Sequence, residues 1–518
     1  MKLYSRGQAR RSVFLTVGFR GLSQIATLAS YIVLVRGLSE ESFGILNLLY
    51  AVIPVISTIA SLGIEQTLSR FQPEYLQRGE NGIAAWLLRV SASSRFVSNL
   101  LVIGLLLLTW KWLAPVFGLE AYRTEFALFS LLIMLHYQAM ILRVSLSSHM
   151  LQGYAIGLMV VLAITKLIAY LMLVHVGRLT LTTAILADTA GYALMYAAMR
   201  IVHARRCAVE RSVGSQRPDA GERRRLLRYA MFNNFNDTGT LLLTSKTDNF
   251  FIAALLNSVA VGAYAFYTRL NEMVSQLLPT RQLSNVIQPL FFSVPVGEAT
   301  ERVPRYFTLL LNTTLALQLP ITIYAAAYHA EIVTVIFGAK FLDVSWLLPV
   351  IVGFATLNRI AEPVTLVAQY QEKASIILLS KLFGLYNAAA ILVLIPIAGL
   401  YGVAVATGTA QLMKNLFIWW HVRTIARWTN FLSVAASNLI IGGGAIAICY
   451  VLKSTMNAPA IVDLACGAVV CTLATLLYLR TPAISESDRQ ILSSVFRGRE
   501  IRILAWLGVV RRPAAEAS

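Results

Sequence analysis

The chain has 518 residues, of which 57% are apolar and only 13% are charged, and its mean hydropathy is +0.67. This composition excludes an ordinary soluble globular domain and indicates a membrane protein. Lysine and arginine number 44 against 25 acidic residues, which gives a formal charge of +19. The placement of the basic residues must therefore distinguish nucleic-acid binding from membrane topology.

Apolar runs of about 20 residues, the length that crosses a bilayer as a helix, recur along the whole chain. We therefore predict an all-α integral membrane protein with about fourteen transmembrane helices. Arg20 interrupts the first run and no small-residue cleavage site follows it, so we expect a retained helix rather than a signal peptide. The predicted spans are residues 12–35, 43–64, 86–109, 124–148, 152–176, 180–201, 229–256, 260–290, 305–329, 344–368, 374–396, 399–421, 431–452 and 459–479.

Basic residues gather in alternate connections between these spans. They occur near the N-terminus, in "RFQPEYLQRGENG", between residues 200 and 228, in "HVRTIARW" and after residue 480. An even number of spans places all of these segments on one side of the membrane, which predicts that both termini are cytoplasmic. The excess positive charge is then explained by topology. Because no recognition module accompanies it, we expect no nucleic-acid partner.

An internal repeat divides the predicted spans. The segment "GLSEESFGILN" aligns with "LLNSVAVGAYA" so that Gly44 meets Gly262, and "RFQPEY" lies at nearly the same offset from "VIQPLF". Turns between membrane helices often use Gly, Ser and Pro, which is the alternative explanation. The repeat predicts two pseudo-symmetric lobes of six helices with a substrate site between them. The predicted parts are an N-lobe at 1–203, a basic cytoplasmic linker at 204–228, a C-lobe at 229–422, two further helices at 423–480 and a cytoplasmic basic tail at 481–518.

Three stretches resemble a known family. "LVRGLSEESFGILN" with "RFQPEYL", "DNFFIAALLNSVAVGAYAFYTRL" and "YNAAAILVLIPIAGLYGVAVATGTAQ" are similar to the polysaccharide transporter family of bacterial flippases, in the multidrug/oligosaccharidyl-lipid/polysaccharide (MOP) exporter superfamily. The resemblance implies twelve core helices plus a C-terminal pair, in the bacterial inner membrane. It also implies transport of a lipid-linked oligosaccharide, such as one carried on undecaprenyl diphosphate, to the outer leaflet. Polysaccharide polymerase or export machinery would be further partners.

Charged residues inside the predicted spans are costly in a bilayer and therefore normally face a cavity or a partner. Arg269 with Glu272, and Arg359 with Glu362, are three apart and can pair on their own helices. Lys246 lies only two residues before Asp248, so on one helix the two charges point in nearly opposite directions unless the helix breaks at "TSKTDN". Three lysines and one arginine have no acidic partner within reach on their own helix: Arg20, Lys166, Lys381 and Lys414.

The surplus of cations predicts a water-filled cavity that binds a diphosphate and its sugars. Snorkelling to the head-group region is the alternative for Arg20 and Lys414. The predicted cavity cations are Lys246, Arg269, Lys381, Lys166, Arg359, Arg20 and Lys414. If transport is coupled to an ion or proton, the expected carriers are Asp248, Glu272, Glu362, Asp188 and Asp237.

No nucleotide-binding or metal-binding motif is present, and the four cysteines have no paired spacing, so we expect no cofactor, metal or disulfide. No catalytic constellation assembles at recognisable spacing, which predicts a transporter rather than an enzyme. Two rivals stay open: a multidrug and toxic compound extrusion (MATE) type cation exporter of the same superfamily, and a polytopic membrane glycosyltransferase or polymerase. The tail from Asp488 to Arg512 is interpreted as an amphipathic interfacial helix or a disordered basic segment.

Overall fold

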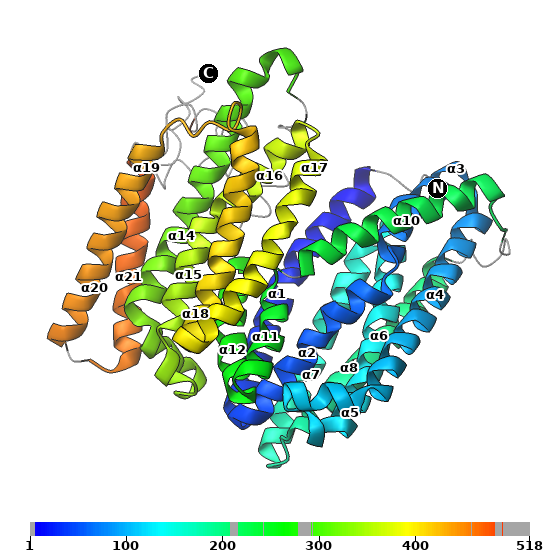
Figure 1. Cartoon of the computed structure of the whole chain (residues 1–518), viewed down its shortest axis with the longest axis horizontal. Helices are drawn as coiled ribbons and strands as arrows, with labels where there is room; N and C mark the ends of the chain where they lie inside the picture. Colours follow the sequence, from blue (N-terminus) through cyan, green and yellow to red (C-terminus); the bar gives the residue numbers. More distant parts are fainter. Residues whose placement is uncertain are drawn as a thin grey trace. The chain divides into compact units, whose positions relative to one another are not determined.

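The computed structural model describes residues 6–207, 216–241, 243–277, 292, 294–456, 458–481 and 489, without the side chains of residues 6–20, 232–240, 277 and 296. Every regular element in this part of the chain is helical, and ten helical segments are long and apolar enough to cross a membrane. The prediction of an all-α membrane protein is therefore confirmed, whereas the exact count of fourteen spans is not. The chain forms two compact units, residues 1–265 and 266–518 (Figure 1).

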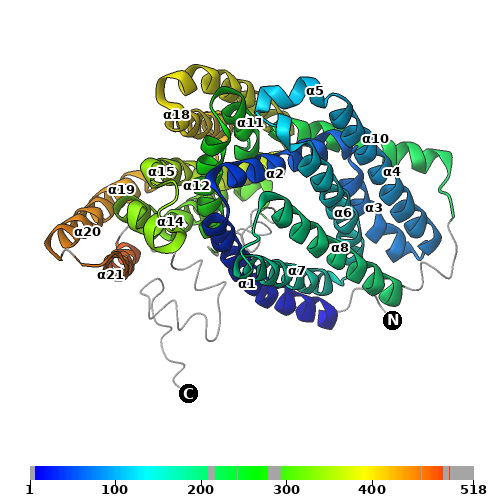
Figure 2. The same cartoon turned by 90° about the horizontal axis from the view of Figure 1, so that it is seen from below.

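Unit 1 is a helical bundle in which sequence-distant helices pack together. The long helix α6 packs against α4 and α8, and α1 lies along α7, as Figure 2 shows. The turn before α8 is fixed by a capping box, in which Thr180 and Thr183 satisfy each other's backbone N–H groups. Its helices are α1 (Arg6–Gly37), α2 (Glu40–Ala60), α3 (Ile64–Arg78), α4 (Asn81–Leu108), α5 (Trp110–Leu113), α6 (Arg123–Ser148), α7 (Gln152–His175), α8 (Leu181–Arg206), α10 (Ala220–Leu241), α11 (Ser245–Leu255) and the first part of α12 (Ser258–Leu277).

Helix α3 is amphipathic and, from Glu65 onward, lies outside the predicted spans. Its apolar residues recur at helical spacing and form a buried cluster with Leu87 of α4, Ile141 of α6 and Leu226 of α10. The opposite side of α3 carries charged residues such as Arg70 and Arg78, which are more than half exposed. Figure 1 shows α3 and α10 beside each other at one end of the long helices of unit 1.

The two glycines that the repeat alignment pairs are in contact. A Cβ atom on Gly44 would lie 1.8 Å from the carbonyl oxygen of Ser258, and one on Gly262 would lie 3.2 Å from that of Glu40. Ser258 precedes Gly262 by four residues, and Glu40 precedes Gly44 by four residues. Each glycine therefore contacts the residue four positions before the other glycine. Such an exchange is what a local two-fold axis produces. It supports the predicted repeat and requires glycine for close backbone approach.

Unit 2 is also helical in its described part. Helix α14 is 39 residues long and is kinked at Tyr328, and it packs against α15 and α21. Beyond the end of α12, the helices are α14 (Ala299–Phe337), α15 (Leu347–Leu357), α16 (Ala361–Tyr370), α17 (Ala374–Leu379), α18 (Phe383–Val422), α19 (Phe431–Ser437), α20 (Gly443–Met456) and α21 (Ala460–Leu479). A 3-10 turn at Asn358–Ile360 joins α15 to α16, and a π-helical turn at Asn438–Gly442 joins α19 to α20.

Helix α18 reverses direction in its middle. Gly399 has φ +54° and ψ −131°, a conformation that essentially only glycine adopts without strain. A Cβ on Gly402 would lie 2.3 Å from the carbonyl oxygen of Leu394, whereas residues eight apart on a straight helix are about 12 Å apart along its axis. The chain therefore turns back on itself, as the two predicted spans 374–396 and 399–421 require.

One predicted span is divided. Residues 229–256 form the end of α10 and all of α11, with a break between Leu241 and Ser245. The sequence had left such a break open at "TSKTDN". The predicted boundaries of lobes, linker and tail stay predictions, and the tail helix from residue 488 lies outside the described residues apart from Arg489.

Candidate functional site

Asp188 of α8 is the centre of a buried polar cluster in unit 1. Its carboxylate is fully buried, and its Oδ1 atom lies 2.7 Å from Nζ of Lys166 on α7. The hydroxyl groups of Tyr50 and Tyr170 each donate a hydrogen bond to one of the carboxylate oxygens. Lys166 and Tyr170 are four apart on α7 and therefore face Asp188 together. Both charged residues were predicted site residues, Lys166 as a cavity cation and Asp188 as an ion or proton carrier. In the structure they form an ion pair.

A second buried ion pair joins α4 to the start of α3. Arg95 is 0% exposed, and its Nε atom lies 3.2 Å from Oε1 of Glu65. The guanidinium also donates to the backbone carbonyl and hydroxyl of Ser57 and lies 4.0 Å from the centre of the Tyr137 ring. This pair is not among the residues predicted from the sequence. The available signal was an arginine inside the predicted span 86–109, but its partner lies thirty residues away on another helix.

Aromatic rings connect the two ion pairs. The His136 ring packs edge-on against Tyr137 at 5.0 Å and against Tyr192 at 5.3 Å. The Tyr192 ring centre lies 5.8 Å from Nζ of Lys166. Nδ1 of His136 is buried and has no hydrogen-bond partner among the described residues. Unit 1 therefore contains a continuous buried run of titratable and aromatic side chains from Glu65 to Asp188.

Lys246 and Asp248 both lie in the first turn of α11. Thr244 before this turn is extended, and the hydroxyls of Thr244 and Thr247 cap the carbonyl of Leu241, which stabilises the break. Asp248 is fully buried and accepts a 2.8 Å hydrogen bond from the Tyr264 hydroxyl. A carboxylate at this position is favoured by the unpaired N–H groups of a helix N-terminus. The half-buried Lys246 precedes it by two residues.

In unit 2, one predicted charge pair is confirmed and one is wrong. Arg269 contacts Glu272 at 3.0 Å, as its helical spacing predicts. Arg359 instead donates to the side-chain oxygens of Gln318 and Ser275, and no ion pair with Glu362 occurs among the described residues. The guanidinium of Arg359 extends instead to two other helices, where Ser275 of α12 and Gln318 of α14 accept its hydrogen bonds, while the charge of Glu362 acts on it from beyond contact distance.

Two lysines on the α17–α18 segment lie near each other. Lys414 is half-buried, and its ammonium group is repelled by that of Lys381. No acidic side chain contacts Lys414 within the part of the chain that the structure describes. The side chains of two further predicted site residues, Arg20 and Asp237, lie outside the described residues.

Residues 9–294 match the model of a family described as polysaccharide biosynthesis protein. The chain belongs to this family. A search of curated protein sequences gave no match. The fold of this polysaccharide biosynthesis protein is similar to "Lipid II flippase MurJ, inward closed conformation", with a TM-score of 0.69 and 12% identity over 90% of this chain and 98% of that one. It is also similar to an inward-facing multidrug resistance MATE transporter of the MOP superfamily, with a TM-score of 0.63 and 12% identity over 79% and 98% of the two chains.

The family member thus has the MOP flippase fold that the sequence resemblance implied, and that expectation is confirmed. The structure also shows which of the predicted cavity cations contact a carboxylate. Lys166 and Arg269 each contact a carboxylate. Arg359 donates hydrogen bonds to neutral groups and has the charge of Glu362 nearby without contact, and the charged neighbour of Lys414 is another lysine. Among the predicted cavity cations, Arg359 and Lys414 of unit 2 are therefore the two described side chains that contact no carboxylate and have no interaction left unidentified.

Proposed function

We propose that this polysaccharide biosynthesis protein moves a lipid-linked oligosaccharide from the cytoplasmic to the outer leaflet of a bacterial inner membrane, with both termini in the cytoplasm. The observation that carries the proposal is the charge of unit 2. Arg359 and Lys414 are half-buried cations without a contacting carboxylate, in a member of a polysaccharide biosynthesis family. Charges inside membrane spans normally face a cavity, a partner or a ligand, and a ligand site in unit 2 is the use that the family membership favours over snorkelling of Lys414.

The cargo headgroup fits this chemistry. A diphosphate replaces its lost water with charge-assisted hydrogen bonds to arginine and lysine, and the planar guanidinium of Arg359 can bind two phosphate oxygens at once. The neighbouring amide of Gln318 and hydroxyl of Ser275 offer the neutral contacts that sugar hydroxyls use. Lys246 and Lys381 remain predicted contributors to the same binding. Undecaprenyl diphosphate is the proposed carrier, and polymerase or export machinery would act on the flipped product.

The Asp188 cluster supports a coupling role. Protonation of Asp188 would remove the negative charge opposite Lys166 and leave a buried cation without its partner, which favours a rearranged state. Two tyrosine hydroxyls at the carboxylate could then exchange donor and acceptor roles with the new proton. Asp188 is therefore the first residue to test for proton-linked transport, ahead of the predicted alternatives Asp248, Glu272, Glu362 and Asp237.

A flip assay in proteoliposomes tests the proposal. The purified chain is reconstituted with a fluorescent diphosphate-linked oligosaccharide lipid, and the fraction that reaches the opposite leaflet is measured over time. Arg359→Gln and Lys414→Gln are each expected to slow movement at least about tenfold, because each removes one charge-assisted contact. Arg305→Gln is the matched control, since Arg305 pairs with Glu301 on an exposed side of α14.

Each outcome of this assay decides between functions. Movement of the anionic lipid that both unit 2 variants slow and the control does not would support the flippase. Movement of an organic cation, without movement of the anionic lipid, would instead support a MATE-type exporter. Lengthening of the glycan on its lipid would instead show a glycosyltransferase or polymerase.

A further inference from the structure

Four arginines surround a hollow of about 600 Å³ between α3 and α10 in unit 1. They are Arg70 of α3 and Arg224, Arg225 and Arg228 of α10, and the rest of the lining is Gly221 and the aromatic residues Phe71 and Tyr229. Residues 65–78 and 220–228 lie outside every span, predicted or found. The hollow therefore shares no residue with the Asp188 cluster or with the proposed unit 2 cations.

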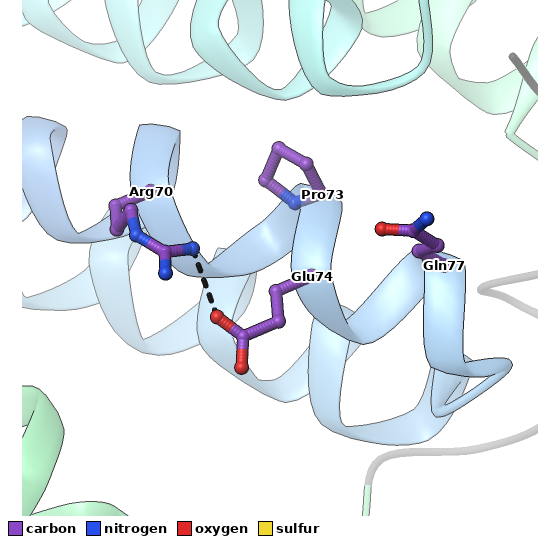
Figure 3. A pocket seen from close by; sticks show the side chains of 4 residues that line it. All are labelled: Arg70, Pro73, Glu74 and Gln77. Carbon is purple, nitrogen blue, oxygen red and sulfur yellow. Dashed lines mark hydrogen bonds and ion pairs between the residues drawn. The ribbon is translucent and has the colours of Figure 1, made fainter. Parts of the chain in front are cut away.

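The acidic residues around the hollow leave positive charge in excess. Glu74 is shared by Arg70, Arg78 and Arg225, and Figure 3 shows its pairing with Arg70 beside Pro73 and Gln77. Burial opposes ionisation of Glu74, but the hydrogen bond from Arg225 and the arginine charges outweigh it and lower its pKa. Glu74 is therefore a carboxylate already engaged by its neighbours.

The second acid, Glu222, is also engaged. It contacts Arg225 at 2.8 Å and accepts a 2.8 Å hydrogen bond from the Tyr75 hydroxyl. By contrast, Arg224 and Arg228 have no ion-pair partner anywhere in the described part of the chain. Both are exposed, and both line the hollow. Two of the four lining charges are therefore available to an anion.

The frame of the hollow is held in place by packing. Phe71 is 3% exposed, and the guanidinium groups of Arg225 and Arg70 lie 4.8 and 5.3 Å from the centre of its ring. The Tyr229 ring meets the Phe71 ring edge-on at 5.2 Å. The buried Leu226 anchors α10 between the arginines. Such preorganisation lowers the entropy lost when a ligand binds.

We propose that this arginine hollow is a second anion site, which binds a phosphate or diphosphate group at a membrane-peripheral surface. Topology alone requires arginines on one side of the membrane, but it does not require four of them to converge on one hollow over aromatic rings. Guanidinium groups bind phosphate oxygens in a fork, and two groups without partners match the double charge of a phosphate. The phosphate can come from a membrane lipid headgroup or from a water-soluble compound.

Two probes distinguish these sources, both applied to the purified full chain. Inorganic pyrophosphate is titrated calorimetrically, with sulfate at equal ionic strength as the competitor. Retention of phosphatidylglycerol against phosphatidylcholine is measured by native mass spectrometry from nanodiscs of mixed composition. The test variant is Arg224→Gln with Arg228→Gln. The matched control is Arg217→Gln with Arg223→Gln, which removes the same charge from the same segment but from outside the hollow.

The test variant is expected to weaken binding of at least one probe about tenfold or more, whereas the control changes it less than twofold. Loss of pyrophosphate binding would identify a soluble phosphate ligand, and loss of phosphatidylglycerol alone would identify a lipid headgroup. Absence of binding for both probes would overturn the proposal. Equal weakening in the two variants would also overturn it, because it would show only general attraction to a basic surface. An unchanged melting temperature shows that both variants are folded.

Discussion

Replacing Gly44 with alanine tests the helix crossing between α2 and α12. The added Cβ would lie 1.8 Å from the carbonyl oxygen of Ser258 and 2.6 Å from its carbonyl carbon. Both are backbone atoms, so no side-chain rotation can relieve the overlap. The two helices have to separate by roughly 1.5 Å to restore an ordinary contact. The equivalent change at Gly262 meets its nearest atoms at 3.2 Å, which a shift of a few tenths of an ångström accommodates.

These distances predict unequal costs at two positions that the repeat makes equivalent. Overpacking costs about 1–3 kcal/mol, and a backbone overlap places Gly44→Ala at the upper end. Alanine regains about 1 kcal/mol through its higher helix propensity. The net loss is about 2 kcal/mol for Gly44→Ala, a factor of roughly 30 in the ratio of folded to unfolded protein. Gly262→Ala is expected to stay within about 1 kcal/mol of the wild type.

Equilibrium unfolding in detergent measures the difference. Gly104→Ala on α4 is the control, since a Cβ there would have no neighbour within 4 Å, and it should be neutral or stabilising. The expected order of stability places Gly104→Ala first, then the wild type and Gly262→Ala, with Gly44→Ala last. A loss at Gly262 as large as that at Gly44 would refute the reasoning, as would an unaffected Gly44→Ala.

Two further predictions concern charged groups. Lys166→Met should destabilise the chain by about 3–5 kcal/mol because it leaves Asp188 buried without its cation, and adding Asp188→Asn should recover most of this loss; additive losses in a double-mutant cycle would count against the pairing. The pKa of Glu74 is lowered in the folded chain, so its stabilising contribution is complete above the ordinary glutamate pKa of about 4.3 and is lost only as the pH falls through the lowered value. Hydrogen exchange of α3, corrected for intrinsic rates, should therefore be constant between pH 8 and 5, and protection lost near neutral pH would contradict this assignment.

The all-α membrane class was predictable, although the number of spans was not confirmed, because a bilayer imposes a length on its helices and forbids unpaired backbone groups inside it. The alignment of Gly44 with Gly262 could also be predicted from the sequence, since a parallel repeat places equivalent turns at the same depth in the membrane. The pair of Arg269 with Glu272 followed from local helical spacing alone.

Partners on different helices were not predictable in this way. The pairing of Lys166 with Asp188 depends on how α7 and α8 rotate against each other, and that of Arg95 with Glu65 depends on where α3 begins. A single sequence contains periodicity within a helix but not the rotation between helices. Arg359 fails for the same reason, because acceptors on two other helices, Ser275 and Gln318, hold its guanidinium in place of Glu362 on the same segment.

The reversal of α18 at Gly399 also bears on how the chain enters the membrane. Residues 382–413 contain no charged side chain and no histidine, so the turn crosses the hydrocarbon core without carrying a charge. The two halves can therefore insert together as one hairpin, with the ammonium groups of Lys381 and Lys414 left behind on the side of origin. Because the two lysines lie at nearly equal distances along the chain from the turn, hairpin closure itself brings the like charges together. Biogenesis and cargo recognition would then depend on the same glycine.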